Sequence, residues 1–410
     1  MRTSDNRVVV TGVGCLTSSG NSAEQYWENL RLSRSGISKI TRFDTEKYRT
    51  KIGGEINLDV SELVGFNVSN LSRNTQFAMA AANETLADCG FADQDIDTKK
   101  IGICLGSGLG GIYYSEESIQ NLQQCGPRGI SPVTVPFVDP NSIVNQVAIR
   151  WGLTGQQFTI STACSSSAHA IGNALDMIRS GRVNAVLTGG VESTITPLVF
   201  AGFDRIRAMS VRNNCPDVAC RPFSDDRDGF VMAEGAAMLM LERESDAMKR
   251  GANIYAEVAG YGATGGAFHV VKPKPEADDL VDAMKLALDD AGILPEQIEL
   301  INPHGTGTRL NDETEYKALK LLFKDCLNNI DITPTKQMTG HMLGAAGAIE
   351  AVHVVKSIKN SCVTPIRYCD NPYRLKINTT KSISHKIVYA LSNSFGFGNN
   401  NVCLVFGAQV

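Results

Sequence analysis

Cys164 is the residue whose type and setting best suit covalent chemistry. It lies within residues 159–170, where a β-prone stretch runs into a turn of small residues and then into a run of helix formers. A thiol at a helix N-terminus faces unpaired backbone N–H groups and the positive end of the helix dipole, which favour the thiolate. The pattern predicts either a nucleophile at a helix tip or a buried structural cysteine, which is what most free cysteines are.

Two histidines, His304 and His341, lie in turns rich in glycine and threonine. The first turn spans residues 301–308 and follows an expected strand, and the second spans residues 335–347. Such turns let a backbone approach a ligand closely, with little side-chain bulk between them. A lone loop histidine is usually a solvated polar group. Two of them, together with a helix-tip cysteine, favour a Cys-His-His site assembled from distant parts of the chain.

Strand and helix patterns alternate along the chain and must position these residues. The first four expected strands are short and buried, and the fifth is an edge or central strand. The expected strands are residues 8–13, 101–105, 158–160, 185–188, 236–241, 255–260, 299–302, 387–391 and 401–406. The expected helices are residues 23–32, 74–89, 141–151, 168–180, 244–250, 277–291, 313–323 and 345–358.

Length and composition are those of an ordinary globular protein. The 410 residues, 43% of them hydrophobic, allow one large core or two halves of about 200 residues each. A net charge of -4 gives no reason to expect nucleic-acid binding. Residues 1–7 lack the apolar core of a signal peptide and no apolar run approaches about 18 residues, so we expect no membrane span.

The eleven cysteines and six histidines are scattered along the chain. The cysteines form no C-x-x-C pair and no finger-like spacing, and the histidines form no H-E-x-x-H pattern. An irregular set of cysteines without an export signal is typical of reduced thiols in the cytoplasm. We therefore expect a cytoplasmic protein without a metal site.

Beyond the segments around Cys164, His304 and His341, five further segments resemble one enzyme family. The chain is similar over essentially its whole length to the β-ketoacyl-acyl-carrier-protein synthases of the thiolase superfamily. It is close to synthase II and to the ketosynthase chain of type II polyketide synthases. Each further segment is weak evidence alone, but their occurrence in this order is specific. These segments are residues 8–14, 106–111, 221–231, 233–236 and 393–398.

The resemblance implies an α/β fold, namely a thiolase-like internal duplication with five layers, α-β-α-β-α, and the site between the halves. We place the N-terminal half at residues 1–252, with the cysteine, and the C-terminal half at residues 253–410, with both histidines. Residues 101–108 resemble residues 298–305 in pattern, each being an apolar strand followed by a glycine loop.

The resemblance also assigns a role to each site residue. Cys164 would hold an acyl chain as a thioester, received from the phosphopantetheine arm of an acyl carrier protein, with no other cofactor. His304 and His341 would donate N–H groups to the enolate formed when malonyl-thioester loses CO₂, which requires both rings to be neutral. The backbone N–H groups of Cys164 and Phe397 would form the oxyanion hole.

Three further roles follow from the resemblance. Lys336, five residues before His341, would support the site electrostatically. The alternative is a surface lysine, which its position in a Thr/Gly turn beside His341 disfavours. Glu350 would orient Lys336. Phe395 and Phe397 match the gating loop of the family, although two phenylalanines in an apolar strand would otherwise be core residues.

Asn399 departs from the family pattern, which usually has a second glycine at this place. If the backbone there has positive φ, asparagine is the least costly residue other than glycine. A stiffer or differently shaped gate would affect chain-length preference rather than activity.

Four segments indicate whether the enzyme serves polyketide or fatty-acid biosynthesis. Residues 195–197, 203–208 and 308–312 look like polyketide ketosynthase chains, whereas residues 126–132 look like synthase II. We favour the ketosynthase chain of a type II polyketide synthase, with housekeeping fatty-acid synthase II as the alternative. A non-catalytic chain-length factor usually lacks the cysteine. A thioester hydrolase remains conceivable, and a biosynthetic thiolase would need a second cysteine in a Cys-x-Gly context, which residues 403–405 do not supply.

The expected partners are an acyl carrier protein and a second chain. A carrier is strongly acidic and this chain is itself net negative, so docking would need a local basic patch. Arg128 and Arg207 match docking positions of synthase II, and Arg205 lies close to Arg207 in sequence. The resemblance implies either a homodimer or a heterodimer with a related chain-length-factor subunit.

Overall fold

The computed structural model describes residues 7–91 and 97–409. Our expectation that the N-terminus lacks a signal peptide concerns residues 1–7, of which the first six lie outside the described part. Among the described residues, no helix is both long and apolar enough to cross a membrane.

The main sheet of the described residues has ten strands, which form two sets of five. The first set is β1 (Val8–Thr17), β4 (Ile101–Gly106), β5 (Gln157–Ile160), β6 (Ala185–Glu192) and β7 (Gly235–Arg243). The second set is β8 (Ala256–Gly265), β9 (Leu300–Asn302), β10 (Asp331–Ile332), β13 (Tyr389–Gly396) and β14 (Asn400–Gly407). Four two-residue strands pair outside these sets: β2 (Ser38–Lys39) with β3 (Ile52–Gly53), and β11 (Cys362–Val363) with β12 (Ile383–Ser384).

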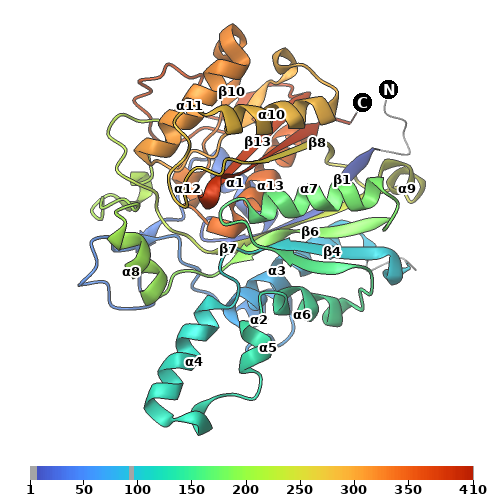
Figure 1. Ribbon diagram of the computed structural model, residues 1–410. Helices are drawn as coiled ribbons and strands as arrows, with labels where there is room; N and C mark the ends of the chain where they lie inside the picture. The colour runs from blue at the N-terminus through green and yellow to red at the C-terminus, as the bar shows by residue number, and fades with distance from the viewer. Residues whose placement is uncertain (1–6, 92–96, 410) are drawn as a thin grey trace.

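The order of the strands is that of an internal duplication (Figure 1). Read across the sheet, it is β10-β9-β13-β14-β8-β1-β7-β6-β4-β5. From the middle outward, each set has two antiparallel pairings followed by two parallel pairings. Strands β4 and β9 therefore occupy equivalent places, as the resemblance between residues 101–108 and 298–305 predicts. Within the described residues, two residue pairs of β1 and β8 join the sets, Val9↔Glu257 and Val10↔Ala256.

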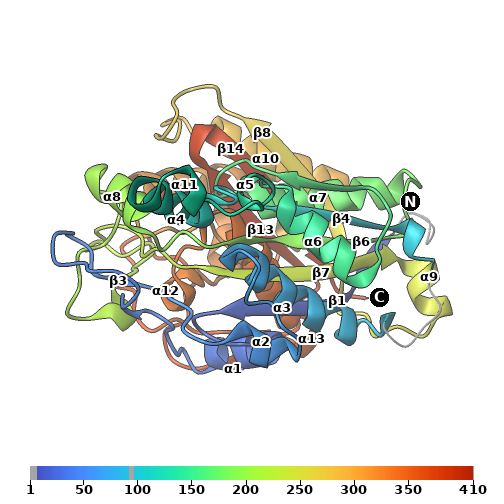
Figure 2. The ribbon, with the colours of Figure 1, turned by 90° about the horizontal axis from the view of Figure 1, so that it is seen from below.

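The helices complete five layers (Figures 1 and 2). Helices α3 and α6 lie outside the first set of strands, α7 and α13 lie between the sets, and α10 and α11 lie outside the second. The thiolase-like α-β-α-β-α fold is thus confirmed. The α-helices are α1 (Ala23–Arg31), α2 (Val60–Val64), α3 (Arg73–Asp88), α4 (Ile112–Cys125), α5 (Thr134–Val138), α6 (Ser142–Trp151), α7 (Ser166–Arg179), α8 (Pro197–Arg205), α9 (Glu244–Lys249), α10 (Asp278–Ala291), α11 (Arg309–Phe323), α12 (Lys336–Thr339) and α13 (Ala346–Asn360).

Most residues of the middle helices are buried, which explains their apolar and small-residue composition. Helix α13 has thirteen buried residues in a run from Ala346 to Ile358, and α7 has ten. They share one apolar cluster with the inner faces of both sets of strands. Two further clusters fill the outer layers, one under α3 and α6 and one under α10 and α11. The site lies at the ends of the middle-layer helices, because the Cys164 turn leads into α7 and the His341 loop leads into α13.

Some expected elements differ from the structure. Residues 158–160 were expected to form a buried strand, but β5 is the outermost strand of the sheet and is only half-buried. Strand β7 is central and fully buried up to its last residue. Helices α2, α4, α5, α8 and α12 and the short strand β10 were not predicted. Helix α4 has no buried residue, so it lacks the apolar stripe on which helix prediction depends.

Candidate active site

Cys164 lies in a tight turn between β5 and α7. Ala163, the residue before it, has a positive φ of 53°, and α7 begins at Ser166. The first turn of α7 packs directly on the ends of β4 and β6, because Gly106 and Gly190 leave no side chain between them. An added Cβ at Gly106 would lie 2.2 Å from the Ser167 backbone nitrogen. These glycines let the turn place the thiol in the middle of the molecule, where it is 6% exposed.

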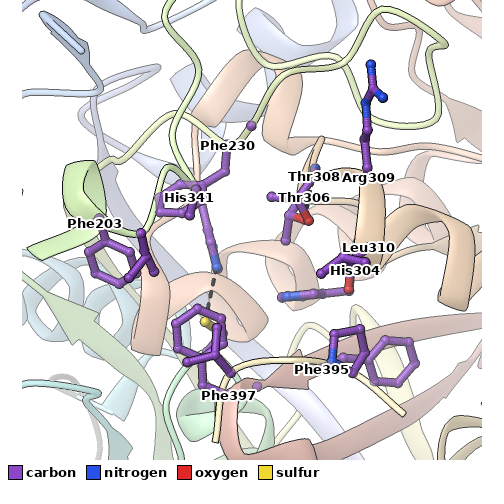
Figure 3. A pocket seen from close by; sticks show the side chains of 18 of the residues that line it. Phe203, Phe230, His304, Thr306, Thr308, Arg309, Leu310, His341, Phe395 and Phe397 are labelled. Atoms are coloured by element: carbon purple, nitrogen blue, oxygen red, sulfur yellow. Dashed lines mark hydrogen bonds between the residues drawn. The ribbon is translucent and has the colours of Figure 1, made fainter. Parts of the chain in front are cut away.

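The structure brings Cys164, His304 and His341 together (Figure 3). The Nε2 atom of His341 lies 3.1 Å from the Sγ atom of Cys164. The two imidazole rings are 5.4 Å apart between centroids, at an angle of 82°. The sulfur and one nitrogen of each ring all lie within 4.8 Å of one another. A small acyl or carboxyl group placed between the rings would therefore contact all three side chains.

Strand topology explains why residues so distant in sequence meet. His304 follows β9 and His341 follows β10 through the short helix α12, and these strands are parallel neighbours. The carboxyl ends of parallel strands open at the same edge of a sheet, where sites commonly form. The His341 loop is also held to the first half, because its backbone N–H donates to Val231 O at 2.7 Å and its carbonyl accepts from Ala233 N at 3.0 Å.

The protonation state of Cys164 differs from our expectation. We expected the helix tip to favour a thiolate, but burial raises the pKa of this thiol to about 12. Lys336 and the backbone N–H groups of Phe397 and Cys164 lower the pKa, as expected for a helix tip and an oxyanion hole, yet burial is the larger effect. The residue is a thiol at rest and must lose its proton as it attacks, and His341 Nε2 lies within reach to accept it.

Both histidines are neutral. Burial lowers the pKa of His304 well below its ordinary value, and Lys336 and His341 lower it further. Burial, followed by Lys336, acts in the same way on His341. The Nζ atom of Lys336 lies 3.5 Å from His304 Nδ1, so Nδ1 accepts and Nε2 carries the proton. This tautomer directs an N–H donor into the pocket.

Lys336 is buried and not on the surface, being 1% exposed. Its ammonium group donates to the His304 carbonyl oxygen and to Glu350 Oε1. Burial raises the pKa of Glu350 to about 7, while Lys336 lowers it. The Oε2 atom of Glu350 has no hydrogen-bond partner among the described residues. The pair ties α12, α13 and the His304 loop together.

We expect Lys336→Met to lower the free energy of unfolding by about 3–5 kcal/mol, because it leaves Glu350 buried without its cation. Lys336→Met/Glu350→Leu should recover most of this loss. The measurement is urea denaturation followed by far-UV circular dichroism. Lys320→Met, at an exposed position of α11, is the control and should change stability by less than about 0.5 kcal/mol. A single variant as stable as the unmodified protein would contradict this account of the pair.

Two buried carboxylates that organise the site were missed from the sequence. Glu315, in α11, accepts the backbone N–H groups of His304 at 2.7 Å and Gly305 at 2.8 Å. Glu192, at the end of β6, accepts from Gly108 N at 2.7 Å and Gly344 N at 3.0 Å. Burial raises the pKa of both to about 7. The sequence did hold a signal for Glu315. It lies in the helix that follows the His304 loop, just as Glu350 lies in the helix that follows the His341 loop.

The site opens into a pocket of about 370 Å³ with an aromatic wall. Phe395 is 8% exposed, and its ring centroid lies 6.0 Å from that of His304. Phe397 is half-buried beside Phe203, with ring centroids 6.1 Å apart, and both residues line the pocket (Figure 3). The volume lies within the range typical of small-molecule sites. Phe395 and Phe397 thus line the pocket together with Cys164 and the two histidines, and their gating role stays a prediction.

The three arginines predicted to dock a carrier do not lie together. Arg205 and Arg207 are exposed at the end of α8, and Arg207 lines the pocket. Arg128 lies in η4 (Pro127–Gly129), in the connection between α4 and α5 that extends away from α8 in Figure 1. Arg309, which the sequence did not single out, also lines the pocket, and its side chain points away from the histidines in Figure 3.

The same three side chains could in principle bind a metal. Thiolate and imidazole are ligands that zinc prefers, and the donor atoms are within 4.8 Å of one another. A bound zinc ion would require the thiolate, whereas burial raises the pKa of Cys164 to about 12. It would also bind to the His304 ring, whose Nδ1 atom lies 3.5 Å from the positively charged Lys336 ammonium. The absence of a resident metal stays a prediction.

The fold and the Cys-His-His arrangement define a thiolase-like condensing enzyme, an acyltransferase that forms carbon–carbon bonds. The chain belongs to the beta-ketoacyl synthase family: residues 5–247 match its N-terminal domain and residues 255–370 its C-terminal domain. It is 41% identical over 407 residues to 3-oxoacyl-[acyl-carrier-protein] synthase 2 of Staphylococcus aureus strain N315, covering 98% of each chain. It is 39% identical to the enzyme of the same description from Coxiella burnetii, covering 97% of this chain and 98% of that one.

Solved structures with the same fold include type II polyketide synthases. One is a type II polyketide acyl-carrier protein in complex with its ketosynthase bound to the hexaketide, matched at a TM-score of 0.91 and 30% identity, covering 98% of this chain and 99% of that one. Another is the ishigamide ketosynthase/chain length factor, matched at 0.91 and 32% with the same coverage. The family and the condensing chemistry are therefore established for this chain.

Proposed function

We propose that this chain joins a Cys164-bound acyl group to malonyl-acyl-carrier protein by decarboxylative Claisen condensation, with His304, His341, Lys336 and the backbone of Phe397 in the roles given above. One observation carries the proposal. The thiol of Cys164, 3.1 Å from His341 Nε2, is directed at the same small space as a neutral His304 and two backbone N–H groups.

The first half-reaction transfers an acyl group. The Cys164 sulfur attacks the carbonyl carbon of an acyl-carrier thioester as His341 Nε2 accepts the thiol proton. The N–H groups of Cys164 and Phe397 hold the oxyanion of the tetrahedral intermediate. The carrier thiolate then leaves and takes up the proton. One thioester has formed and one has broken, so the step is nearly balanced in free energy.

The second half-reaction forms the carbon–carbon bond. Malonyl-thioester loses CO₂, and the electron pair of the broken bond forms an enolate whose oxygen accepts hydrogen bonds from His304 Nε2–H and from His341. His341 leaves the acylation step protonated on Nδ1, so its proton must move to Nε2 before it can donate to the enolate. The enolate carbon attacks the acyl-Cys164 thioester, and collapse of the intermediate expels the Cys164 sulfur as a thiolate, which takes one proton from solvent. The product is a 3-oxoacyl chain on the carrier.

We further propose that the enzyme is the ketosynthase chain of a type II polyketide synthase. Leu310 and Asn311, from the polyketide-like segment of residues 308–312, line the pocket itself, so this likeness concerns substrate contact. The second candidate is a fatty-acid synthase II enzyme, supported by 41% identity to the Staphylococcus enzyme. We place the two functional halves at residues 1–252 and 253–410, and the protein in the cytoplasm with its eleven cysteines as free thiols.

Intact-mass analysis of carrier proteins tests the reaction and the pathway together. Incubation with an acyl carrier and malonyl carrier should give a 3-oxoacyl carrier two carbons longer than the primer, with one CO₂ released. Repeated unreduced extension, dependent on co-expression of a chain-length-factor subunit, supports the polyketide proposal. A fully active homodimer that makes long fatty acyl products supports the fatty-acid candidate. A chain that never elongates any primer contradicts both.

The carrier is proposed to dock beside Arg207. Arg207 lines the pocket that a phosphopantetheine arm must enter, and Arg205 is exposed two residues before it. Among the described residues, neither forms an ion pair with an acidic side chain within 4 Å. Arg212, by contrast, pairs with Asp226 and Asp228. Arg128 could join the docking surface only if the second chain of a dimer brings it near the pocket.

We expect Arg207→Glu to raise the KM for carrier-bound substrate by about tenfold, because it reverses an attraction for an acidic partner. Raised salt should weaken binding of the unmodified protein. Initial rates with carrier-bound and small acyl-thioester substrates are the measurement, and the latter should barely change. Lys249→Glu, on α9 at the opposite end of the molecule from α8 in Figure 1, is the matched control. Equal effects of the two charge reversals would refute this docking surface, and Arg128→Glu measures separately whether the second chain contributes.

A further inference from the structure

Asn399 connects two loops at the pocket. It lies in η9 (Phe397–Asn399) and is 4% exposed, and its positive φ of 57° is the condition under which asparagine is the least costly residue other than glycine. Its Oδ1 atom accepts the backbone N–H groups of Phe268 at 3.3 Å and His269 at 3.2 Å. Its Nδ2 atom donates to the Lys272 carbonyl oxygen at 3.0 Å. One side chain thus satisfies three backbone groups of residues 266–272, the segment that follows β8.

Two backbone hydrogen bonds accompany these contacts. Gly398 N donates to Val270 O at 2.7 Å, and Gly266 N donates to Asn399 O at 2.9 Å. A glycine at position 399 would keep both of these and lose all three side-chain bonds. The side chain, and not the shape of the loop, therefore provides most of the connection between residues 266–272 and residues 396–400.

The neighbouring segment is shaped around this asparagine. A Cβ added to Gly266 would lie 2.6 Å from Asn399 Cβ and 2.3 Å from Asp279 Oδ2. Val271 and Pro273 line the same pocket as Phe397 and Asn399. The connected loops therefore form one continuous side of the pocket mouth.

We propose that Asn399 is a latch that holds the Phe397 gate closed against residues 266–272, and so sets how readily long acyl groups reach Cys164. The proposal rests on the proposed function, because it takes Phe397 as the gate for acyl loading. Opening this gate requires Phe397 and its neighbours to move, and the three side-chain bonds break if the two loops separate. Asn399 is a positioning residue, since it acts on the substrate only through the loop.

Hydrogen exchange tests the latch without any substrate. In Asn399→Gly, amides of residues 266–272 and 396–400 should exchange about tenfold faster or more, because three hydrogen bonds no longer oppose opening. Asn400→Gly is the matched control: it adds a glycine to the same loop, but its Nδ2 bond, to Phe397 O at 3.0 Å, stays within the loop. It should leave exchange in residues 266–272 unchanged. Asn399→Asp keeps both acceptor contacts and should fall between the two.

Acylation kinetics test the consequence. Cys164 of Asn399→Gly should take a long acyl chain from its carrier several-fold faster than the unmodified protein, while acetyl transfer changes little. Unchanged exchange in residues 266–272, or long-chain acylation no faster than in Asn400→Gly, would overturn the latch. If the unmodified protein takes no acyl group on Cys164, the proposed function fails, and the exchange comparison alone then decides whether the latch exists.

Discussion

Replacing Cys164 by alanine is expected to abolish condensation, lowering the rate by at least about a thousandfold, because the acyl chain loses its covalent acceptor. The fold should survive, since alanine is small enough for the turn and the thiol is not needed to fill space there. Intact mass after incubation with an acyl carrier is the direct measurement. The unmodified protein should gain one acyl group, and the variant none.

Cys104→Ala is the control for this experiment. Cys104 is a buried thiol, as Cys164 is, but it lies in β4 within the apolar cluster of the middle layer. Its replacement should leave acylation and condensation close to those of the unmodified protein. A Cys164→Ala protein that still elongates a labelled primer would rule out the covalent mechanism. An unmodified protein that is folded but never acylated would instead point to a non-catalytic chain-length factor.

Loss of either histidine is expected to suppress decarboxylation of malonyl carrier by about a hundredfold or more, which is typical of removing one donor to a developing oxyanion. The structure separates the two residues in the acylation step. His341 contacts the Cys164 sulfur, whereas His304 is held by Lys336 and lies farther along the pocket. His304→Ala should therefore leave acylation nearly intact, and His341→Ala should slow it moderately.

Release of ¹⁴CO₂ from labelled malonyl carrier, measured beside acyl-enzyme formation, distinguishes these steps. His385→Ala is the control, because His385 bonds to Asp331 near the surface and is remote from the pocket lining. It should release CO₂ at the rate of the unmodified protein. Decarboxylation that persists at that rate in both His304→Ala and His341→Ala would show that the enolate is stabilised by other groups.

The sequence was sufficient for most features that depend on local pattern. Alternation and helical periodicity located most of the strands and helices, including those around Cys164 and His304, because burial of one face leaves its period in the chain. The duplication was visible in the likeness of residues 101–108 to residues 298–305. The order of weak segments identified the family, and with it the site residues, without any knowledge of their distances.

Tertiary structure decided what depends on contacts between distant residues. Burial has a larger effect on the pKa of Cys164 than the helix tip has. The fold places Lys336 inside the protein beside Glu350. The fold also separates Arg128 from Arg207 within one chain and makes β5 an edge strand. Solvation and pairing depend on the surroundings supplied by other segments, which a single stretch of sequence does not contain. For the same reason, the departure at Asn399 could be noticed in the sequence, but its three hydrogen bonds to residues 268–272 could be found only in the folded chain.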